Sequence, residues 1–388
     1  MVTTTLLTII YLAFIGLGLP DSILGAAWPT MVRDLHAPLW GAGLIQMTVS
    51  LCTVVSSLNS ARLILRFGTG RLTAWSVVLT AAALMGMSIV PGYAFLLLLS
   101  VPLGLGAGAV DASINNYVAL HCEPKHMNWL HCFWGVGTIV GPAVMSAALT
   151  RGMPWTAGYR GVSLLQFALS LVLFATLGLW RDGRMQEGER EARVLSAAQV
   201  LALPGAKFGL LNFTCYCAVE SIFMLWSATY LVMARGVDET LAVSMGALFF
   251  VGITAGRGLS GFIAMRLKPR QMVRLGQTVM AASCLLLLVP ARGAALAGLV
   301  LMGLGCAPVY PNIVQDTPRN YGAENSQAVI GVQMAFAYIG SLLMPTVFGW
   351  LAELCGYGAL PAFSLALTAL MIVLFNRQQR IVDAKNRA

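Results

Sequence analysis

The stretch GLGAGAVDASIN, residues 104–115, decides the fold, because it is apolar and rich in glycine yet carries an acid, Asp111. The first three residues of this stretch, GLG, recur 199 residues later at the start of GLGCAPVYPNIV, residues 303–314. Both copies lie inside long uncharged runs. One such match is weak by itself, since glycine-rich helices resemble one another in composition, so its weight depends on what surrounds it.

Three further matches follow in the same order along the chain. RFGTGRLTAWS aligns with RLKPRQMVRLG, which starts 200 residues later. GVGTIVGPAV resembles AYIGSLLMPTV and sets Pro142 opposite Pro345, while PDSI and VESI make Asp21 and Glu220 counterparts. Four ordered matches at a nearly constant offset predict an internal repeat of two similar halves.

The composition predicts an integral membrane protein. Of the 388 residues, 58% are hydrophobic and 10% are charged, against about 45–50% and about 25% in ordinary soluble domains. The excess recurs as uncharged runs of about 20 residues, the length that spans a bilayer core of about 30 Å. Only helices satisfy their own backbone in lipid within a single segment, so we expect an all-α protein. Twelve transmembrane helices are predicted, at residues 6–31, 40–61, 73–91, 94–119, 128–149, 159–180, 207–234, 240–264, 271–290, 293–315, 326–350 and 357–376.

The basic residues indicate topology rather than a nucleic-acid partner, since they are spread over short segments between the apolar runs. With the N-terminus inside, 18 Lys and Arg fall on its side of the membrane, 5 fall on the other, and Arg257 lies within a span. This asymmetry predicts a multi-pass protein of the cell inner membrane with both termini cytoplasmic. We expect the first span to be retained rather than cleaved as a signal peptide.

The charged stretch RDGRMQEGEREARVLSAAQ separates the two sets of six helices. It predicts an N-terminal half at 1–181, a cytoplasmic linker at 182–206 and a C-terminal half at 207–388. In such repeats the substrate site lies near mid-membrane where the halves meet. No Walker, HExxH or GxSxG motif and no zinc-ligand spacing occurs in the sequence, which argues against an enzyme, a cofactor or a metal site.

Three carboxylates fall within spans: Asp21, Asp111 and Glu220. A charge at the bilayer centre costs about 2.5–3.5 kcal/mol on insertion scales, so such acids face a cavity or a partner and commonly mark an ion path. They are candidate proton-coupling groups, and the alternative is that each is neutral or paired and only fixes helix packing. Arg257 is expected to snorkel to the cytoplasm or to help close the inner end of the path.

Polar and aromatic residues near these acids are candidate ligands. Asn115 lies one helical turn after Asp111 and therefore on the same face. His131 can relay protons, or it can simply bond a neighbouring carbonyl. The remaining substrate-binding candidates offer amides that bond hydroxyls or join helices, and aromatic faces that stack on sugars or belong to the interfacial belt. They are Gln46, Asn312, Gln333, Trp134, Trp226 and Tyr338.

The repeat and its motifs resemble the major facilitator superfamily over essentially the whole chain. GLGAGAVDASINNYVAL, MNWLHCFWGVGTIVGP and GCAPVYPN look like its fucose permease and sodium-dependent glucose transporter group, although Leu65 stands where the superfamily usually has an aspartate. The resemblance implies that spans one, four, seven and ten line the path. It also implies that Asp111, at the position of an acid in the fucose/proton symporters, responds to protons.

The sequence therefore predicts a secondary transporter that moves a small polar solute, by resemblance a sugar, through alternating access coupled to protons. Sodium-coupled sugar transport and proton-driven efflux of drugs or metabolites remain open. A non-transporting membrane sensor is the alternative from another class. The predicted partners are the solute, a proton or sodium ion and the lipid bilayer, and one monomer suffices because both halves belong to one chain.

Overall fold

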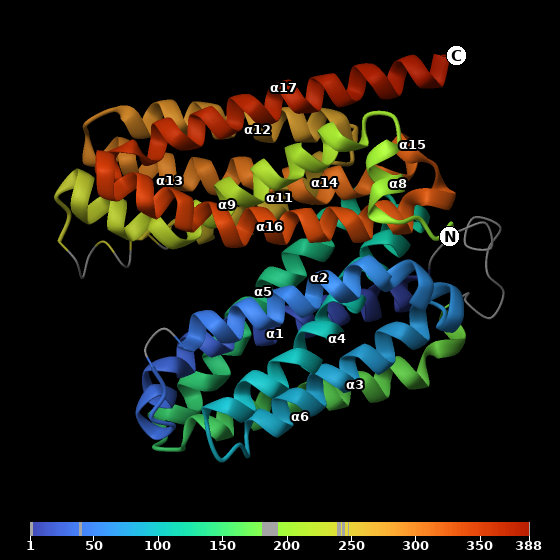
Figure 1. Ribbon diagram of the computed structural model, residues 1–388, viewed down its shortest axis with the longest axis vertical. Helices are drawn as coiled ribbons and strands as arrows, with labels where there is room; N and C mark the ends of the chain where they lie inside the picture. The colour runs from blue at the N-terminus through green and yellow to red at the C-terminus, as the bar shows by residue number, and fades with distance from the viewer. Residues whose placement is uncertain are drawn as a thin grey trace. The chain divides into compact units, whose positions relative to one another are not determined.

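The computed structural model describes residues 3–38, 41–180, 193–238, 242, 245–246 and 248–387. Every regular element within these ranges is a helix (Figure 1). The longer helices are α1 (Thr4–Asp34), α2 (Gly41–Phe67), α3 (Thr69–Met87), α4 (Tyr93–His121), α5 (Pro124–Thr150), α6 (Trp155–Ala175), α9 (Ala206–Arg235), α11 (Leu248–Ile263), α12 (Pro269–Leu288), α13 (Arg292–Cys306), α16 (Ala323–Cys355) and α17 (Leu360–Arg387). Short ones are η1 (Leu177–Leu179), α8 (Ala197–Ala202), α14 (Val309–Gln315), α15 (Thr317–Tyr321) and η3 (Tyr357–Ala359).

Eleven segments of the described chain are long and apolar enough to cross a membrane, and α11, with 16 residues, is a shorter apolar helix. Residues 240–241, 243–244 and 247 of the predicted eighth span lie outside the described residues. Large apolar side chains such as Leu98, Leu171 and Trp350 are exposed on these helices, as expected of surfaces that face lipid. The prediction of an all-α membrane protein with twelve spanning helices is confirmed.

The predicted tenth span is interrupted, forming α13 and α14. Pro308 and Pro311 have no backbone N–H, so two rungs of the helical ladder are lost at this point. The Asn312 Nδ2 donates to the Pro308 carbonyl oxygen at 2.7 Å, which satisfies an acceptor within the interruption. A sequence pattern based on apolar length alone does not resolve such a break.

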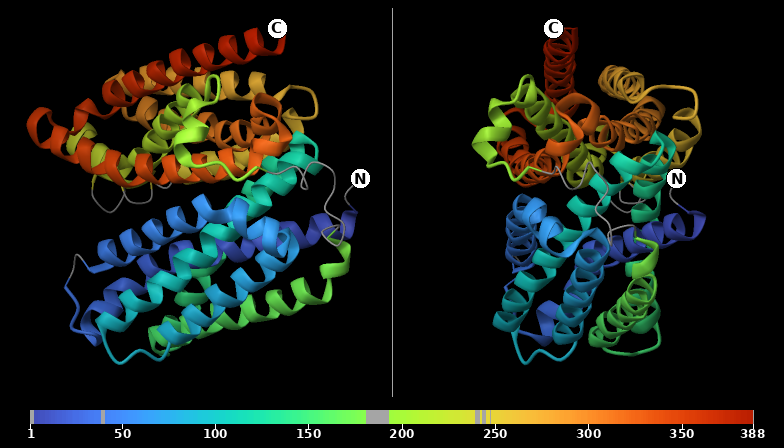
Figure 2. Two further views of the ribbon diagram at one scale, coloured as in Figure 1. Left: turned by 45° about the vertical axis from the view of Figure 1, so that its right-hand side comes forward. Right: turned by 90° about the vertical axis from the view of Figure 1, so that its right-hand side faces the viewer.

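The chain forms two compact units, and α5 and α16 each contribute to both. Unit 1 comprises Met1–Cys122, Leu130–Val194 and Ala323–Gly331, and unit 2 comprises Glu123–Trp129, Leu195–Gly322 and Val332–Ala388. Within unit 1, α4 packs against α2 and α3, and α3 packs against α6; within unit 2, α13 packs against α11 and α12 (Figure 2). Of the predicted linker 182–206, residues 182–192 lie outside the described residues, and α8 lies in the remainder.

Glycines set the closest helix contacts of unit 1. A Cβ on Gly104 or Gly108 of α4 would collide with the Val49 or Thr53 carbonyl oxygen of α2. The Thr53 hydroxyl donates to the Gly104 carbonyl oxygen at 3.1 Å across the same contact. Close approach through small residues and hydroxyl bonds is the usual way that helices associate in membranes. The glycine-rich stretch thus holds α4, and with it Asp111, against its neighbours.

Candidate functional site

An acid, an amide and an imidazole form a hydrogen-bonded chain in unit 1. The Asn115 Nδ2 donates to Asp111 Oδ1 at 2.8 Å and to the Asp111 carbonyl oxygen at 2.9 Å. The Asn115 Oδ1 lies 3.1 Å from His131 Nε2. Because an amide oxygen only accepts hydrogen bonds, His131 Nε2 must carry a proton in this arrangement. The chain links α4 to α5 and contains two groups that can titrate.

Asp21 of α1 lies beside this chain. Its carboxylate interacts electrostatically with Asp111, and its Oδ2 accepts a hydrogen bond from Trp134 Nε1 of α5 at 2.9 Å. Asp21 is exposed, Asp111 is half-buried, and Asn115 and His131 are buried. Phe14 packs edge-on against His131, with ring centroids 5.6 Å apart. Two acids, an amide, an imidazole and an indole therefore meet in one part of unit 1.

Backbone contact between α1 and α5 positions Asp21 and Trp134. A Cβ on Gly18 would collide with the Trp134 carbonyl oxygen, and one on Gly137 would collide with the Ile15 carbonyl oxygen. The Ser22 hydroxyl donates to the Thr138 carbonyl oxygen at 2.8 Å. The GVGTIVGP motif thus gives α5 the small surface on which α1 rests.

Glu220 has a different environment from its repeat counterpart Asp21. In unit 2, Arg257 Nη2 of α11 lies 3.0 Å from Glu220 Oε1 of α9, and the two side chains are 5% and 12% exposed, respectively. Of the two expectations for Arg257, the snorkelling one is wrong: its guanidinium is held inside unit 2 because pairing with an acid there satisfies its charge. Arg257 is thus the partner of Glu220 that sequence reasoning missed.

The remaining candidates occupy separate places. Gln46 is exposed on α2, and Tyr338 is half-buried on α16. In unit 2, Asn312 Nδ2 donates to Asn128 Oδ1 at 3.1 Å, and Gln333 Oε1 accepts from the Thr317 hydroxyl at 3.1 Å. Both amides thus already join elements to one another.

Trp226 lies in an aromatic group of unit 2. Its Nε1 donates to the Pro345 carbonyl oxygen at 2.9 Å, joining α9 to α16. Its ring packs against Phe348 and Tyr357, with centroids 6.2 and 5.4 Å away. This environment is that of a helix-packing residue.

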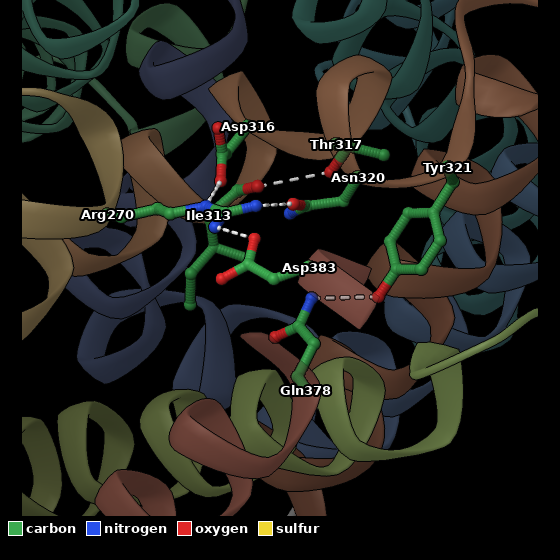
Figure 3. Close-up of polar contacts among 8 residues, drawn as sticks. All are labelled: Arg270, Ile313, Asp316, Thr317, Asn320, Tyr321, Gln378 and Asp383. Atoms are coloured by element: carbon green, nitrogen blue, oxygen red, sulfur yellow. Dashed lines mark hydrogen bonds and ion pairs between the residues drawn. The ribbon is translucent and has the colours of Figure 1, made fainter. Parts of the chain in front are cut away.

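A second polar cluster in unit 2 gathers around Arg270 at the start of α12 (Figure 3). Its guanidinium bonds Asp383 of α17 at 2.6 Å, Asp316 at 3.2 Å and Asn320 at 3.1 Å. Burial raises the pKa of Asp316 above its ordinary value, while Arg270 and Arg319 oppose that rise. The RLKPRQMVRLG stretch predicted a basic segment here, but it could not identify acids far along the chain.

These features define a helical membrane protein with buried ionisable groups in both units. The chain belongs to the major facilitator superfamily, whose family model matches residues 10–291 and 209–386. It is 25% identical over 324 residues to the membrane protein MosC of Rhizobium meliloti, covering 81% of this chain and 76% of MosC. It is also 22% identical over 351 residues to an uncharacterized MFS-type transporter of Enterobacter sp. (strain 638), covering 87% and 86%.

Solved structures share the fold at lower identity. The MFS transporter FucP in its outward conformation has a TM-score of 0.74 at 15% identity, with 97% of this chain and 98% of FucP covered. The proton:xylose symporter XylE has a TM-score of 0.80 at 10% identity, with 97% and 95% covered. The resemblance to the superfamily is confirmed by the family model, and the fold is shared with FucP.

Proposed function

We propose that the protein is a secondary active transporter that couples proton movement to the translocation of a small polar solute of the sugar class. The observation that carries the proposal is the chain of Asp111, Asn115 and His131, with Asp21 beside it. A carboxylate and an imidazole joined by one amide offer two protonation sites within reach of a single hydrogen-bonded path. Among the structural relatives, FucP and XylE are proton symporters of sugars by name, which supports the class of solute.

Asp111 is the proposed proton-responsive group, with Asp21 and His131 assisting. Protonation of Asp111 removes the charge that its bonds with Asn115 stabilise, and weakens the repulsion from Asp21. Each change alters the relative free energies of the conformations of the transport cycle. A proton can shift that equilibrium only if it binds one conformation more tightly than another. The Glu220–Arg257 pair is proposed to hold α9 against α11, and Glu220 takes part in coupling only if that pair opens.

The proposed substrate contacts begin with Gln46 and Trp134. Trp134 bonds Asp21, and Gln46 lines the same cavity as Asp21. Asn115, Asn312, Gln333, Trp226 and Tyr338 complete the set. Four of these residues already bond protein groups and would exchange those bonds for solute bonds: Asn115, Asn312, Gln333 and Trp226. We further propose a monomer in the cell inner membrane with both termini in the cytoplasm.

The test is uptake of labelled sugars by proteoliposomes under an imposed proton or sodium gradient. We expect accumulation under the proton gradient. Asp111→Asn should abolish accumulation while exchange of labelled for unlabelled solute continues, because exchange needs no net proton movement. Glu353→Gln, which removes an exposed acid of α16, is the matched control and should transport normally.

Three results would contradict the proposal. Uptake driven by the sodium gradient alone would show that sodium, and not the proton, is the coupling ion. Undiminished accumulation by the Asp111→Asn variant would show that Asp111 is not needed for coupling. If no sugar is transported under either gradient, sugars are excluded as the class of solute.

A further inference from the structure

Three helices of unit 2 meet at one end of that unit, where α17 packs against both α9 and α12 (Figure 1). A Cβ on Gly205, the residue before α9, would lie 3.3 Å from the Gln378 carbonyl oxygen of α17. Arg270, in the first turn of α12, bonds Asp383 of α17 at 2.6 Å. The first turns of α9 and α12 therefore lie against the last turns of α17.

Three basic side chains gather at this junction. Lys207 Nζ lies 5.3 Å, and Arg377 Cζ lies 4.7 Å, from the ring centroid of Phe208. Arg274 Nη2 of α12 donates to Asn376 Oδ1 at 3.4 Å, beside Arg377 in the chain. We call Lys207, Arg274 and Arg377 the basic triad, and all three residues are exposed.

The basic triad has no compensating negative charge in the described part of the chain. None of the ion pairs among the described residues includes a member of the triad. Two acids at the same end of unit 2, Asp316 and Asp383, are paired with Arg270 at 3.2 and 2.6 Å. Like charges held on one aromatic ring repel each other, so an anion bound between Lys207 and Arg377 would be stabilised by both.

The neighbouring surface favours an anion with an apolar tail. Leu211 lies one helical turn after Lys207, and Val373 lies one turn before Arg377, so each apolar residue shares a helix face with its basic residue. Both are exposed, Leu211 at 46% and Val373 at 61%, as surfaces that face acyl chains are. A free phosphate would contact the triad alone. A phospholipid would also cover Leu211 and Val373.

We infer that the basic triad binds the phosphate group of an anionic phospholipid whose acyl chains lie along α9 and α17. Guanidinium groups bind phosphate oxygens through two parallel hydrogen bonds, and an ammonium adds a point charge. Basic pockets between spanning helices on the cytoplasmic side suit anionic headgroups. With both termini in the cytoplasm, as proposed, this lipid belongs to the inner leaflet. The inference goes beyond the proposed function, because it requires no particular solute or coupling ion.

The experiment titrates the full-length protein, in detergent micelles, with dioleoylphosphatidylglycerol or dioleoylphosphatidylcholine and counts the bound lipids by native mass spectrometry. We expect the first phosphatidylglycerol to bind at least about fivefold more tightly than the first phosphatidylcholine, the effect of one basic residue at a membrane surface. Glycerol 1-phosphate carries the same phosphate chemistry without acyl chains. It is the third probe, and it should not displace phosphatidylglycerol at equal concentration.

A double variant and a matched control locate the binding in the triad. Lys207→Gln/Arg377→Gln should weaken phosphatidylglycerol binding about 25-fold, which is about fivefold for each charge removed. Arg62→Gln/Arg66→Gln removes two exposed basic residues of α2 in unit 1 and should leave the affinity for the first phosphatidylglycerol unchanged. Arg377→Gln alone should weaken binding about fivefold, and it covers the case in which the double variant does not fold.

Equal affinities for phosphatidylglycerol and phosphatidylcholine would overturn the lipid site. Equal losses in the two double variants would overturn it as well, because they would show a general attraction between lipid and positive charge. Displacement of phosphatidylglycerol by equimolar glycerol 1-phosphate would show that the triad binds a soluble phosphate and not a lipid.

Discussion

Asp21 and Glu220 occupy equivalent positions of the repeat but have different partners. Asp21 accepts a hydrogen bond from the neutral indole of Trp134, whereas Glu220 is paired with the cation Arg257. A neutral donor leaves the charge of Asp21 unbalanced, while a guanidinium compensates that of Glu220. The sequence presented both residues as similar acids in spans. We therefore propose Asp21 for proton exchange and Glu220 for holding helices together.

The Glu220–Arg257 pair makes a prediction about stability. Glu220→Gln or Arg257→Gln alone leaves one buried charge without its partner, which should cost about 3–5 kcal/mol. The double variant removes both charges and should recover most of that loss. Thermal unfolding of the four proteins in detergent measures the coupling. Additive losses in the double variant would show that the pair does not act as a unit.

The hydrogen-bonded chain was predictable in part. Helical spacing was enough to place Asn115 on the face of Asp111, because one turn separates them. No spacing rule could bring His131 of the next helix to Asn115, or Trp134 to Asp21, since those contacts depend on how α5 packs. Arg257 was noticed in the sequence, but its partner lies 37 residues earlier on another helix.

At the scale of elements, glycine decides how closely α1 and α5 approach. The motif GVGTIVGP was recognisable as a small-residue surface, yet the sequence could not say which helix lies against it. In the structure Gly137 meets the backbone of Ile15, and Gly141 meets that of Leu19. Similarly, Pro308 and Pro311 were visible in the sequence, but apolar length alone predicted one uninterrupted span where α13 and α14 form.

The α1–α5 contact predicts that alanine destabilises the protein at one glycine of these helices but not at another. Gly137→Ala places a Cβ against the Ile15 carbonyl oxygen, so the helices must separate, at a cost of about 1–3 kcal/mol as for other overpacked sites. Gly25→Ala on α1 is the control, because a Cβ there meets nothing within 4 Å. Unfolding of both variants in detergent checks the difference. Equal stability would contradict the proposed contact.

The Arg270 cluster joins the start of α12 to Asp316 and to α17, and it predicts a pH dependence. Burial raises the pKa of Asp316, so the folded protein favours the protonated acid. The stability that protonated Asp316 contributes is fully present below the ordinary aspartate pKa of about 4. It is lost as pH rises through the raised pKa of Asp316 in the folded protein. Relative to Asp316→Asn, the wild type should therefore lose stability as pH rises from about 4 towards neutrality.

Thermal unfolding of the wild type and of Asp316→Asn across that range measures the effect. A wild type that gains stability relative to the variant over this range would show that pairing with Arg270 outweighs burial.

At the scale of the whole molecule, the repeat and the apolar runs were sufficient to predict the fold. Length and composition define the spanning helices, and the repeat relates their two sets. The contributions of α5 and α16 to both compact units were not predictable, because hydropathy does not report which unit a helix end packs with. The proposed orientation still rests on 18 Lys and Arg against 5.

That orientation can be tested with single cysteines in a variant that lacks the eight native ones. Ser196→Cys before α8, Lys385→Cys near the end of α17 and Met153→Cys between α5 and α6 all replace exposed residues. A membrane-impermeant maleimide added to intact cells should label only Met153→Cys, because the basic side stays in the cytoplasm. Permeabilised cells should show labelling of all three. Labelling of Ser196→Cys and Lys385→Cys in intact cells would reverse the topology, and with it the direction in which the proposed proton gradient acts on Asp111.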